Sequence, residues 1–193
     1  MPPRAKFTKE EIINAGLEIL KEKDLSSVTA REIGKRLKSS SRPIFTTFQN
    51  MNEVMEGIKD KAREIYTEYI QQGLKETIAF RGVGQAYIMF AIKEPKLFQL
   101  LFMNKQKEDL GVNKILPEIE NNYDEIVNSI TDNYPVSKDD AISLYRHLWI
   151  YSHGIATLCA NGMCKFSGEE IANMLTEVFK SLLKEKLGKQ HHD

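Results

Sequence analysis

The sequence predicts an all-α protein of about nine helices, with an N-terminal three-helix head at residues 1–50 and a larger helical domain at residues 51–193. Apolar residues recur at three- and four-residue spacing through most of the chain, whereas few segments alternate as strands do. Only six prolines interrupt the 193 residues. Capping sequences, in which a Ser, Thr or Asn precedes an acidic residue by three positions, mark several helix starts.

The expected helices follow one another with short breaks. We place them at about residues 9–23, 30–37, 42–48, 51–75, 80–93, 95–103, 114–133, 138–160 and 169–187. In a capping box the side-chain oxygen accepts from an otherwise unbonded backbone N–H, and the acid lies at the positive helix end. Five helix starts carry such a sequence or a close variant: Thr8, Thr29, Asn50, Ser137 and Ser167.

Two prolines and a polar segment set further boundaries. Pro43 suits the first turn of the third helix, where its missing N–H costs little, and Pro135 ends the seventh helix. The polar segment 104–112 is expected to be a mobile loop. Along the fourth helix, the apolar spacing predicts an inward face of Val54, Ile58, Ala62, Ile65 and Tyr69.

The composition is that of an ordinary globular protein, with 41% hydrophobic and 28% charged residues. No apolar run is long enough to span a bilayer, and the N-terminus has no apolar export signal, so we expect a cytoplasmic protein without a membrane partner. Net charge is zero, but Lys and Arg exceed Asp and Glu in the first fifty residues and fall short of them in the rest. A basic head on an acidic body favours a polyanion partner at one end.

The sequence contains no motif of an enzyme, a cofactor site or a metal site. It lacks G-x-S-x-G, H-E-x-x-H and a phosphate loop, so we expect no catalytic residues, no cofactor and no metal. The two cysteines, Cys159 and Cys164, have poor zinc spacing. We interpret them as unpaired structural thiols, with a redox sensor as the alternative.

The segment from Val28 to Phe48 carries the functional prediction. It reads as a capped helix of about two turns, a polar break and a second short helix. This is the layout of a helix-turn-helix, in which the second helix enters the major groove of DNA. The alternative is an ordinary helical hairpin with a solvated basic face. Apolar residues expected to hold the two helices are Val28, Ile33, Leu37, Ile44, Phe45 and Phe48.

The outward residues of this segment are of the types that bond phosphates and base edges. Together with one lysine that precedes the first helix, they form the candidate DNA-binding set: Lys6, Thr29, Arg31, Ser39, Ser40, Ser41, Arg42, Thr46 and Thr47.

Residues 8–58 resemble the DNA-binding domain of the TetR family of regulators. The family's T-x-x-x-[IL]-[AG] opening of the second helix is matched by Thr29, Ile33 and Gly34, and its [IL]-[YF]-x-x-F ending of the recognition helix by Ile44, Phe45 and Phe48. Farther along, Trp149, His153 and Gly154 are similar to a W-x-x-x-H-G segment of one subgroup. The resemblance implies a dimeric repressor that binds an operator in double-stranded DNA and responds to a small molecule.

Three positions depart from the family pattern. Lys38 stands where members usually have Gly, so a conserved turn would place it at positive φ, at a cost of roughly 1 kcal/mol. Phe45 replaces the usual aromatic hydroxyl, and Met51 replaces a frequent Lys. These changes put two phosphate contacts in doubt and leave open a helical sensor or adaptor that has lost specific DNA binding. Cations that could compensate are Arg4, Lys6, Lys9, Arg31 and Lys35.

The rest of the chain is expected to dimerise and to bind the effector. Apolar stripes at 138–160 and 169–187 predict a homodimer through these two helices, although an internal core is the alternative. Aromatic and sulfur side chains with a few polar groups suit a small, partly hydrophobic ligand whose binding shifts the fourth helix, although each residue is equally consistent with plain packing. The candidate ligand-binding residues are Tyr87, Phe90, Phe102, Met103, Tyr123, Trp149 and His153.

Overall fold

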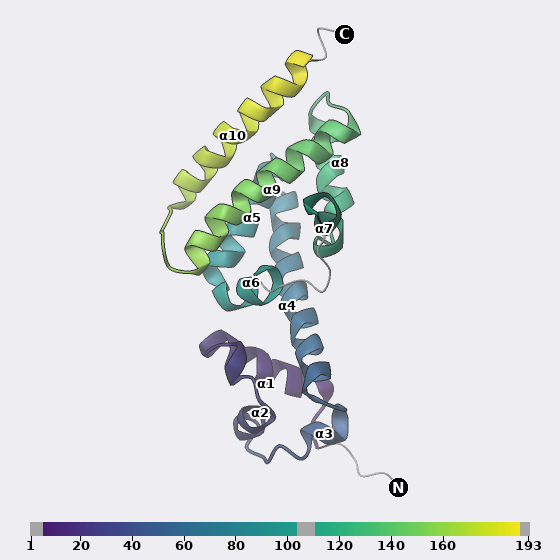
Figure 1. The fold of residues 1–193 in the computed structure, drawn as a ribbon, viewed down its shortest axis with the longest axis vertical. Coiled ribbons are helices and arrows are strands. Elements are labelled where there is room, and N and C mark those ends of the chain that lie inside the picture. The colour runs from purple at the N-terminus through teal and green to yellow at the C-terminus, as the bar shows by residue number, and fades with distance from the viewer. Residues whose placement is uncertain (1–5, 104–110, 190–193) are drawn as a thin grey trace. The chain divides into compact units, whose positions relative to one another are not determined.

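The computed structural model describes residues 6–103 and 111–189, and the described chain is helical throughout, as predicted (Figure 1). It contains ten α-helices and one 3-10 turn, η1 (Leu25–Ser27). The α-helices are α1 (Lys9–Glu22), α2 (Ala30–Arg36), α3 (Ile44–Thr47), α4 (Met51–Leu74), α5 (Ala79–Lys93), α6 (Pro95–Phe102), α7 (Val112–Ile119), α8 (Tyr123–Asn133), α9 (Lys138–Ala160) and α10 (Gly168–Lys189).

The capping sequences begin helices where they were expected. Thr8 forms a full capping box with Glu11 at the start of α1, and Thr29 caps α2. Ser137 accepts from the backbone N–H of Asp140 at the start of α9. These local bonds satisfy donors that no helical carbonyl can reach.

One predicted helix is wrong. The segment 114–133 forms two helices, α7 and α8, with a break at residues 120–122. The Glu120 carboxylate accepts from the backbone N–H of Asn122 at 3.1 Å, so the side chain competes with helix continuation. Pro117 also lies inside α7 and removes one backbone donor.

Smaller differences concern the third and fourth helices and one loop. Pro43 precedes α3 instead of lying in its first turn. In α4 the buried stripe continues through Tyr66 and Ile70, whereas Ile65 and Tyr69 are half-buried, so the predicted inward face was wrong by one residue after Ala62. Most of the predicted loop at 104–112 lies outside the described residues, and α7 begins at its end.

The chain forms two compact units. The first contains α1, α2, α3, the first part of α4 up to Ile65, and α6. Its core holds Ile12, Leu20, Ile33, Ile44 and Ile58, all almost inaccessible to solvent. The ammonium of Lys21 lies 3.0 Å from the Glu94 carboxylate, at the start of α6. The predicted domain boundary after residue 50 stays a prediction.

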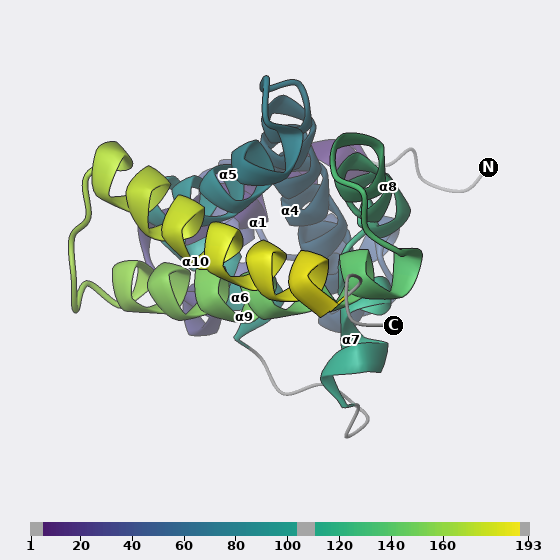
Figure 2. The same ribbon diagram turned by 90° about the horizontal axis from the view of Figure 1, so that it is seen from above.

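The second unit contains the rest of α4 from Tyr66, together with α5 and α7–α10. In both views α10 lies alongside α9, and both helices contact α5 (Figures 1 and 2). α4 and α5 meet at Gly73 and Gly82, where a Cβ added at Gly82 would lie 2.1 Å from the carbonyl oxygen of Gly73. Only glycine allows backbones to approach so closely.

Candidate functional site

The turn after α2 has the hydrogen bonds of a Schellman motif. The Ser39 N–H donates to the Gly34 carbonyl at 2.8 Å, and the Lys38 N–H donates to the Lys35 carbonyl at 3.0 Å. Lys38 has a φ of 52°, which confirms the positive φ expected from its place in the turn. A left-handed residue of this kind ends α2 and redirects the chain toward α3.

Gly34 makes the return of the chain possible. A Cβ at this position would lie 2.8 Å from the carbonyl oxygen of Ser40 and 3.0 Å from the backbone nitrogen of Ser41. Both neighbours are backbone atoms, which cannot rotate away as a side chain can. The last turn of α2 and the serine segment therefore touch through their backbones.

Four of the six residues predicted to hold the two helices are buried: Val28, Ile33, Ile44 and Phe48. Leu37 is half-buried. Phe45 is 48% exposed, so the expectation that it helps to hold the helices together was wrong. Successive helical residues point about 100° apart, so a helix of four residues that buries Ile44 turns Phe45 outward.

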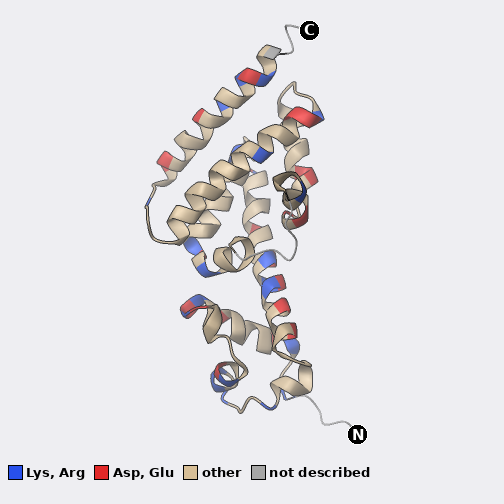
Figure 3. Cartoon of the chain, viewed as in Figure 1, with Lys and Arg blue, Asp and Glu red and all other residues tan. Residues whose placement is uncertain are grey.

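Three of the predicted DNA-binding cations are exposed in the first unit. The Lys6 ammonium donates to the Ser39 hydroxyl at 3.2 Å. Arg31 and Arg42 are exposed and make no ion pair within the part of the chain that the structure describes. Figure 3 shows Lys and Arg on α2 and on the segment that follows it. The turn therefore presents hydroxyls together with uncommitted positive charge.

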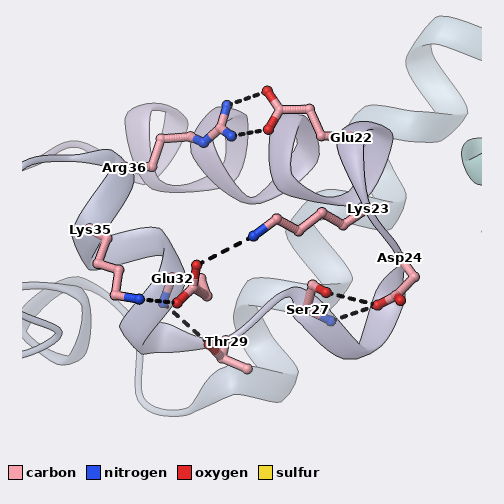
Figure 4. Close-up of polar contacts among 8 residues, drawn as sticks. All are labelled: Glu22, Lys23, Asp24, Ser27, Thr29, Glu32, Lys35 and Arg36. Carbon is pink, nitrogen blue, oxygen red and sulfur yellow. Dashed lines mark hydrogen bonds and ion pairs between the residues drawn. The ribbon is translucent and has the colours of Figure 1, made fainter.

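Other cations of the first unit are already paired (Figure 4). Arg36 donates to both Glu22 and Glu18, and Lys35 donates to Glu32 at 2.6 Å. The hydrogen bonds from Arg36 and Lys35 lower the pKa of the Glu22 and Glu32 carboxyls, respectively. These contacts tie α2 to α1 and to itself.

Two of the cations that could compensate for lost phosphate contacts are thus paired. Lys35 bonds Glu32, and the Lys9 ammonium lies 3.5 Å from Glu53. Arg4 lies outside the described residues. Lys6 and Arg31 remain as candidates for that compensation.

The predicted threonines divide into two groups. Thr29 accepts from the Glu32 N–H at 3.2 Å as the α2 cap, and Thr47 donates to the Phe7 carbonyl at 3.3 Å. Both therefore have local structural partners. Thr46 is exposed on α3, as Ser40 is on the turn.

The second unit contains a cavity of about 260 Å³ between α5, α9 and α10. Of the seven residues predicted to bind a ligand, Tyr87 and Trp149 line this cavity. An engineered apolar cavity of about 150 Å³ holds benzene, so this cavity has room for a larger molecule. The other aromatic rings on its walls are Tyr66, Phe80, Tyr134, Tyr145 and Phe179.

The structure does not bring the remaining five residues into the lining. Phe90 is fully buried, His153 accepts from or donates to the Tyr87 hydroxyl at 2.8 Å, and Tyr123 packs on Tyr145. Phe102 and Met103 belong to the first unit. These side chains lie behind the cavity wall or elsewhere, because helical spacing alone does not fix which packed residues face a void.

The sequence interpretation missed the polar side of the cavity. Tyr66, Tyr145 and Glu120 all line it, and Glu120 is only 3% exposed. The available signal was spacing: Glu120 follows Leu116 by four residues and precedes Val127 by seven, in a stripe that is otherwise apolar. A carboxylate at an inward position is rarely placed there for packing.

Burial shapes the titration of these groups. Desolvation raises the pKa of Glu120, although hydrogen bonds from Tyr66 and Asn122 partly oppose the rise. Burial also raises the pKa of the Tyr66, Tyr87 and Tyr145 phenols, and the nearby Glu120 charge adds to each rise. Burial lowers the pKa of His153, whose ring stacks on Trp149 at 5.0 Å.

Both cysteines are free thiols, Cys159 half-buried and Cys164 exposed. Burial raises the pKa of Cys159, which reduces its thiolate fraction and hence its reactivity. Across the described ranges, no three His, Cys, Asp or Glu side chains are grouped so that they could hold a metal ion, and no helix is long and apolar enough to cross a membrane.

Comparison with known proteins identifies the family. Residues 80–185 match the family model described as the tetracyclin repressor-like C-terminal domain. The chain belongs to the TetR family. This match covers more than half of the chain, and the TetR assignment rests on it.

A solved structure shows the same fold. It is the crystal structure of a TetR-like transcriptional regulator from Rhodococcus sp. RHA1, with 13% sequence identity and a TM-score of 0.62. The similarity covers 92% of this TetR chain and 95% of that one. No curated protein sequence matches. The two chains therefore share one fold over most of their length.

Proposed function

We propose that this TetR-family protein is a repressor that binds operator DNA as a homodimer and is released by a small, partly hydrophobic molecule. The observation that carries the DNA-binding part is the turn between α2 and α3. There Lys38 adopts positive φ, Lys6 donates to the Ser39 hydroxyl, and Arg42 directly follows the three serines. Arg31 is exposed in the first turn of α2, and neither arginine makes an ion pair in the described chain. Exposed cations and hydroxyls of this kind bond phosphates and base edges.

The homodimer is proposed to form through α9 and α10. On α9, Ile150 is 49% exposed, and a Cβ added at Gly154 would meet no atom within 4 Å. His147, Ile150 and Gly154 share one face of α9, because they are three and four residues apart. An open, partly apolar helix face supports contact with a second copy, and two heads would read two half-sites.

The release step is proposed to act through α4. This helix is continuous from Met51 to Leu74. Its early residues Val54 and Ile58 are buried in the first unit, and its later residue Tyr66 lines the cavity of the second. A ligand that favours one position of Tyr66 would bias the whole helix. Switching nearly all molecules requires a difference of about 5 kcal/mol between the two states.

Selection of bound sequences from random duplex DNA tests this proposal. We expect an enriched motif with twofold symmetry, and an affinity that falls steeply with salt because cations on the protein release counterions from phosphates. Failure to enrich any motif at low salt would leave a helical sensor or adaptor that has lost specific DNA binding.

The Arg42→Ala variant tests whether this side chain contacts a DNA base. If Arg42 reads a base, we expect a loss of about 1–3 kcal/mol in specific binding and relaxed selection at one position. Lys165→Ala, which removes an exposed cation from the second unit, is the matched control and should bind as the unmodified protein does. Equal affinities of the two variants in a mobility-shift titration would contradict the role of Arg42.

A further inference from the structure

The cavity of the second unit contains a buried carboxyl group that pairs with no cation among the residues the structure describes. The Glu120 carboxylate accepts from the Tyr66 hydroxyl, from the Asn122 backbone N–H at 3.1 Å and from the Asn122 amide at 3.2 Å. All three are neutral donors. A buried charge without a counter-charge is costly even when it is hydrogen-bonded.

A second polar group at the cavity has no hydrogen-bond partner among the described residues. The Tyr145 hydroxyl is buried and has no hydrogen-bond partner in the described chain, although Tyr145 lines the cavity. Glu120 and Tyr145 both line this cavity. The cavity therefore offers a carboxylate and a phenol oxygen to whatever occupies it.

The remaining wall is aromatic. The ring centroids of Tyr66 and Tyr87 lie 6.0 Å apart in an edge-to-face contact. The centroids of Tyr87 and Trp149 are 6.4 Å apart, and those of Phe80 and Tyr145 are 6.3 Å apart. Ring faces attract cations through their quadrupole, and the attraction is larger where water is excluded. Such walls do not suit a hydrated inorganic ion, which needs several oxygen ligands.

We propose that the cavity binds a small organic cation, an amine carried on an aromatic or other apolar frame, with its ammonium group at Glu120. The proposal rests on the proposed function, because it names the chemical class of the effector. An ammonium group has three donors, which the Glu120 carboxylate and the Tyr145 hydroxyl would accept. The apolar frame would take the space between the rings.

The two cations on the cavity lining do not favour an anionic ligand instead. Arg81 and Lys180 are exposed, so water and salt screen their charges. Glu120 is 3% exposed and acts through a medium of lower dielectric constant. The buried negative charge therefore dominates the choice of ligand at the inner wall.

A matched set of three probes tests the charge. The probes are 4-phenylbutylamine, 4-phenyl-1-butanol and 4-phenylbutyrate, which share one frame and carry an ammonium, a hydroxyl and a carboxylate. Calorimetric titration of the full chain at neutral pH should give affinities in the order amine, alcohol, carboxylate. We expect at least about a tenfold gap between amine and alcohol, as a charge-assisted hydrogen bond provides.

The Glu120→Gln variant tests the residue. In this variant the affinity for the amine should fall to within about threefold of the affinity for the alcohol. The affinity for the alcohol should stay nearly unchanged, because only the amine forms a charge-assisted hydrogen bond with the carboxylate. Glu118→Gln removes an exposed carboxylate from the last turn of α7, two residues before Glu120, and should keep the amine preference. Circular dichroism checks that both variants keep their helical content.

The outcomes separate this proposal from the regulator proposal. Equal binding of amine and carboxylate, an amine preference that survives in Glu120→Gln, or no binding of any probe would overturn the organic-cation assignment. DNA selection by the ligand-free protein would stand in each case. If the amine binds through Glu120 but leaves DNA affinity unchanged, the ligand class holds and the effector role fails.

Discussion

Lys38 adopts a backbone conformation that is unfavourable for a residue with a Cβ. Its φ of 52° costs a side chain with a Cβ roughly 1 kcal/mol relative to glycine. We therefore expect Lys38→Gly to raise the free energy of unfolding by up to about 1 kcal/mol. The gain is smaller than the relieved strain because glycine also gives the unfolded chain more conformational entropy. Urea denaturation measures the change. Lys35→Gly lies within α2 and should change stability in the opposite direction; a destabilised Lys38→Gly would contradict the argument.

Glu120 makes stability depend on pH. Its folded-state pKa is raised above the ordinary value of 4.5, so the unfolded chain loses this proton first as pH increases. The native state then binds more protons than the unfolded state, and stability falls as pH rises from 4.5 to the raised pKa. The glutamine in Glu120→Gln cannot titrate. As pH rises through this window, the melting temperature of the variant should therefore increase relative to that of the unmodified protein. If the melting temperatures of the two proteins changed in parallel with pH, the raised pKa of Glu120 would be refuted.

Among the elements, helix starts were predictable because they depend on residues three positions apart. Thr8 with Glu11 and Ser137 with Asp140 form the expected capping bonds. The break between α7 and α8 was not predictable in the same way, because it depends on a Glu120 carboxylate that is held by Tyr66 of α4, fifty-four positions away. The same long-range packing decides that Tyr87 and Trp149 face the cavity while Phe90 does not.

The close approach of α4 and α5 at Gly73 and Gly82 leaves no room for a side chain at Gly82. In Gly82→Ala the new Cβ would lie 2.1 Å from the Gly73 carbonyl oxygen, so the helices must separate. We expect a loss of about 1–3 kcal/mol in the free energy of unfolding, as for an overpacked core. Gly188→Ala meets no atom within 4 Å and should be neutral or stabilising, by at most about 1 kcal/mol. Similar urea midpoints for the two variants would show that the crossing can relax.

At the scale of the whole molecule, the family was visible in the sequence and the ligand site was only partly visible. Thr29, Ile33, Gly34 and Phe48 are near one another in the chain and carry a local motif. The cavity draws on α4, α5, α9 and α10 and on the residue after α7, so no local pattern reports it. Spacing identified two wall residues but not the carboxyl group that distinguishes this cavity from a plain apolar one.

The proposed homodimer should depend on the open face of α9. Ile150→Glu places a charge where a second copy would bury it, and an unpaired buried carboxylate is costly. We expect a shift from dimer to monomer in sedimentation velocity at micromolar concentration. Binding to a two-half-site operator should weaken at the same time, since each monomer would hold only one half-site. Ile92→Glu, at the end of α5 and also partly exposed, is the matched control and should stay dimeric. A dimeric Ile150→Glu protein would move the interface away from this face, whereas dissociation with unchanged DNA affinity would show that one head suffices.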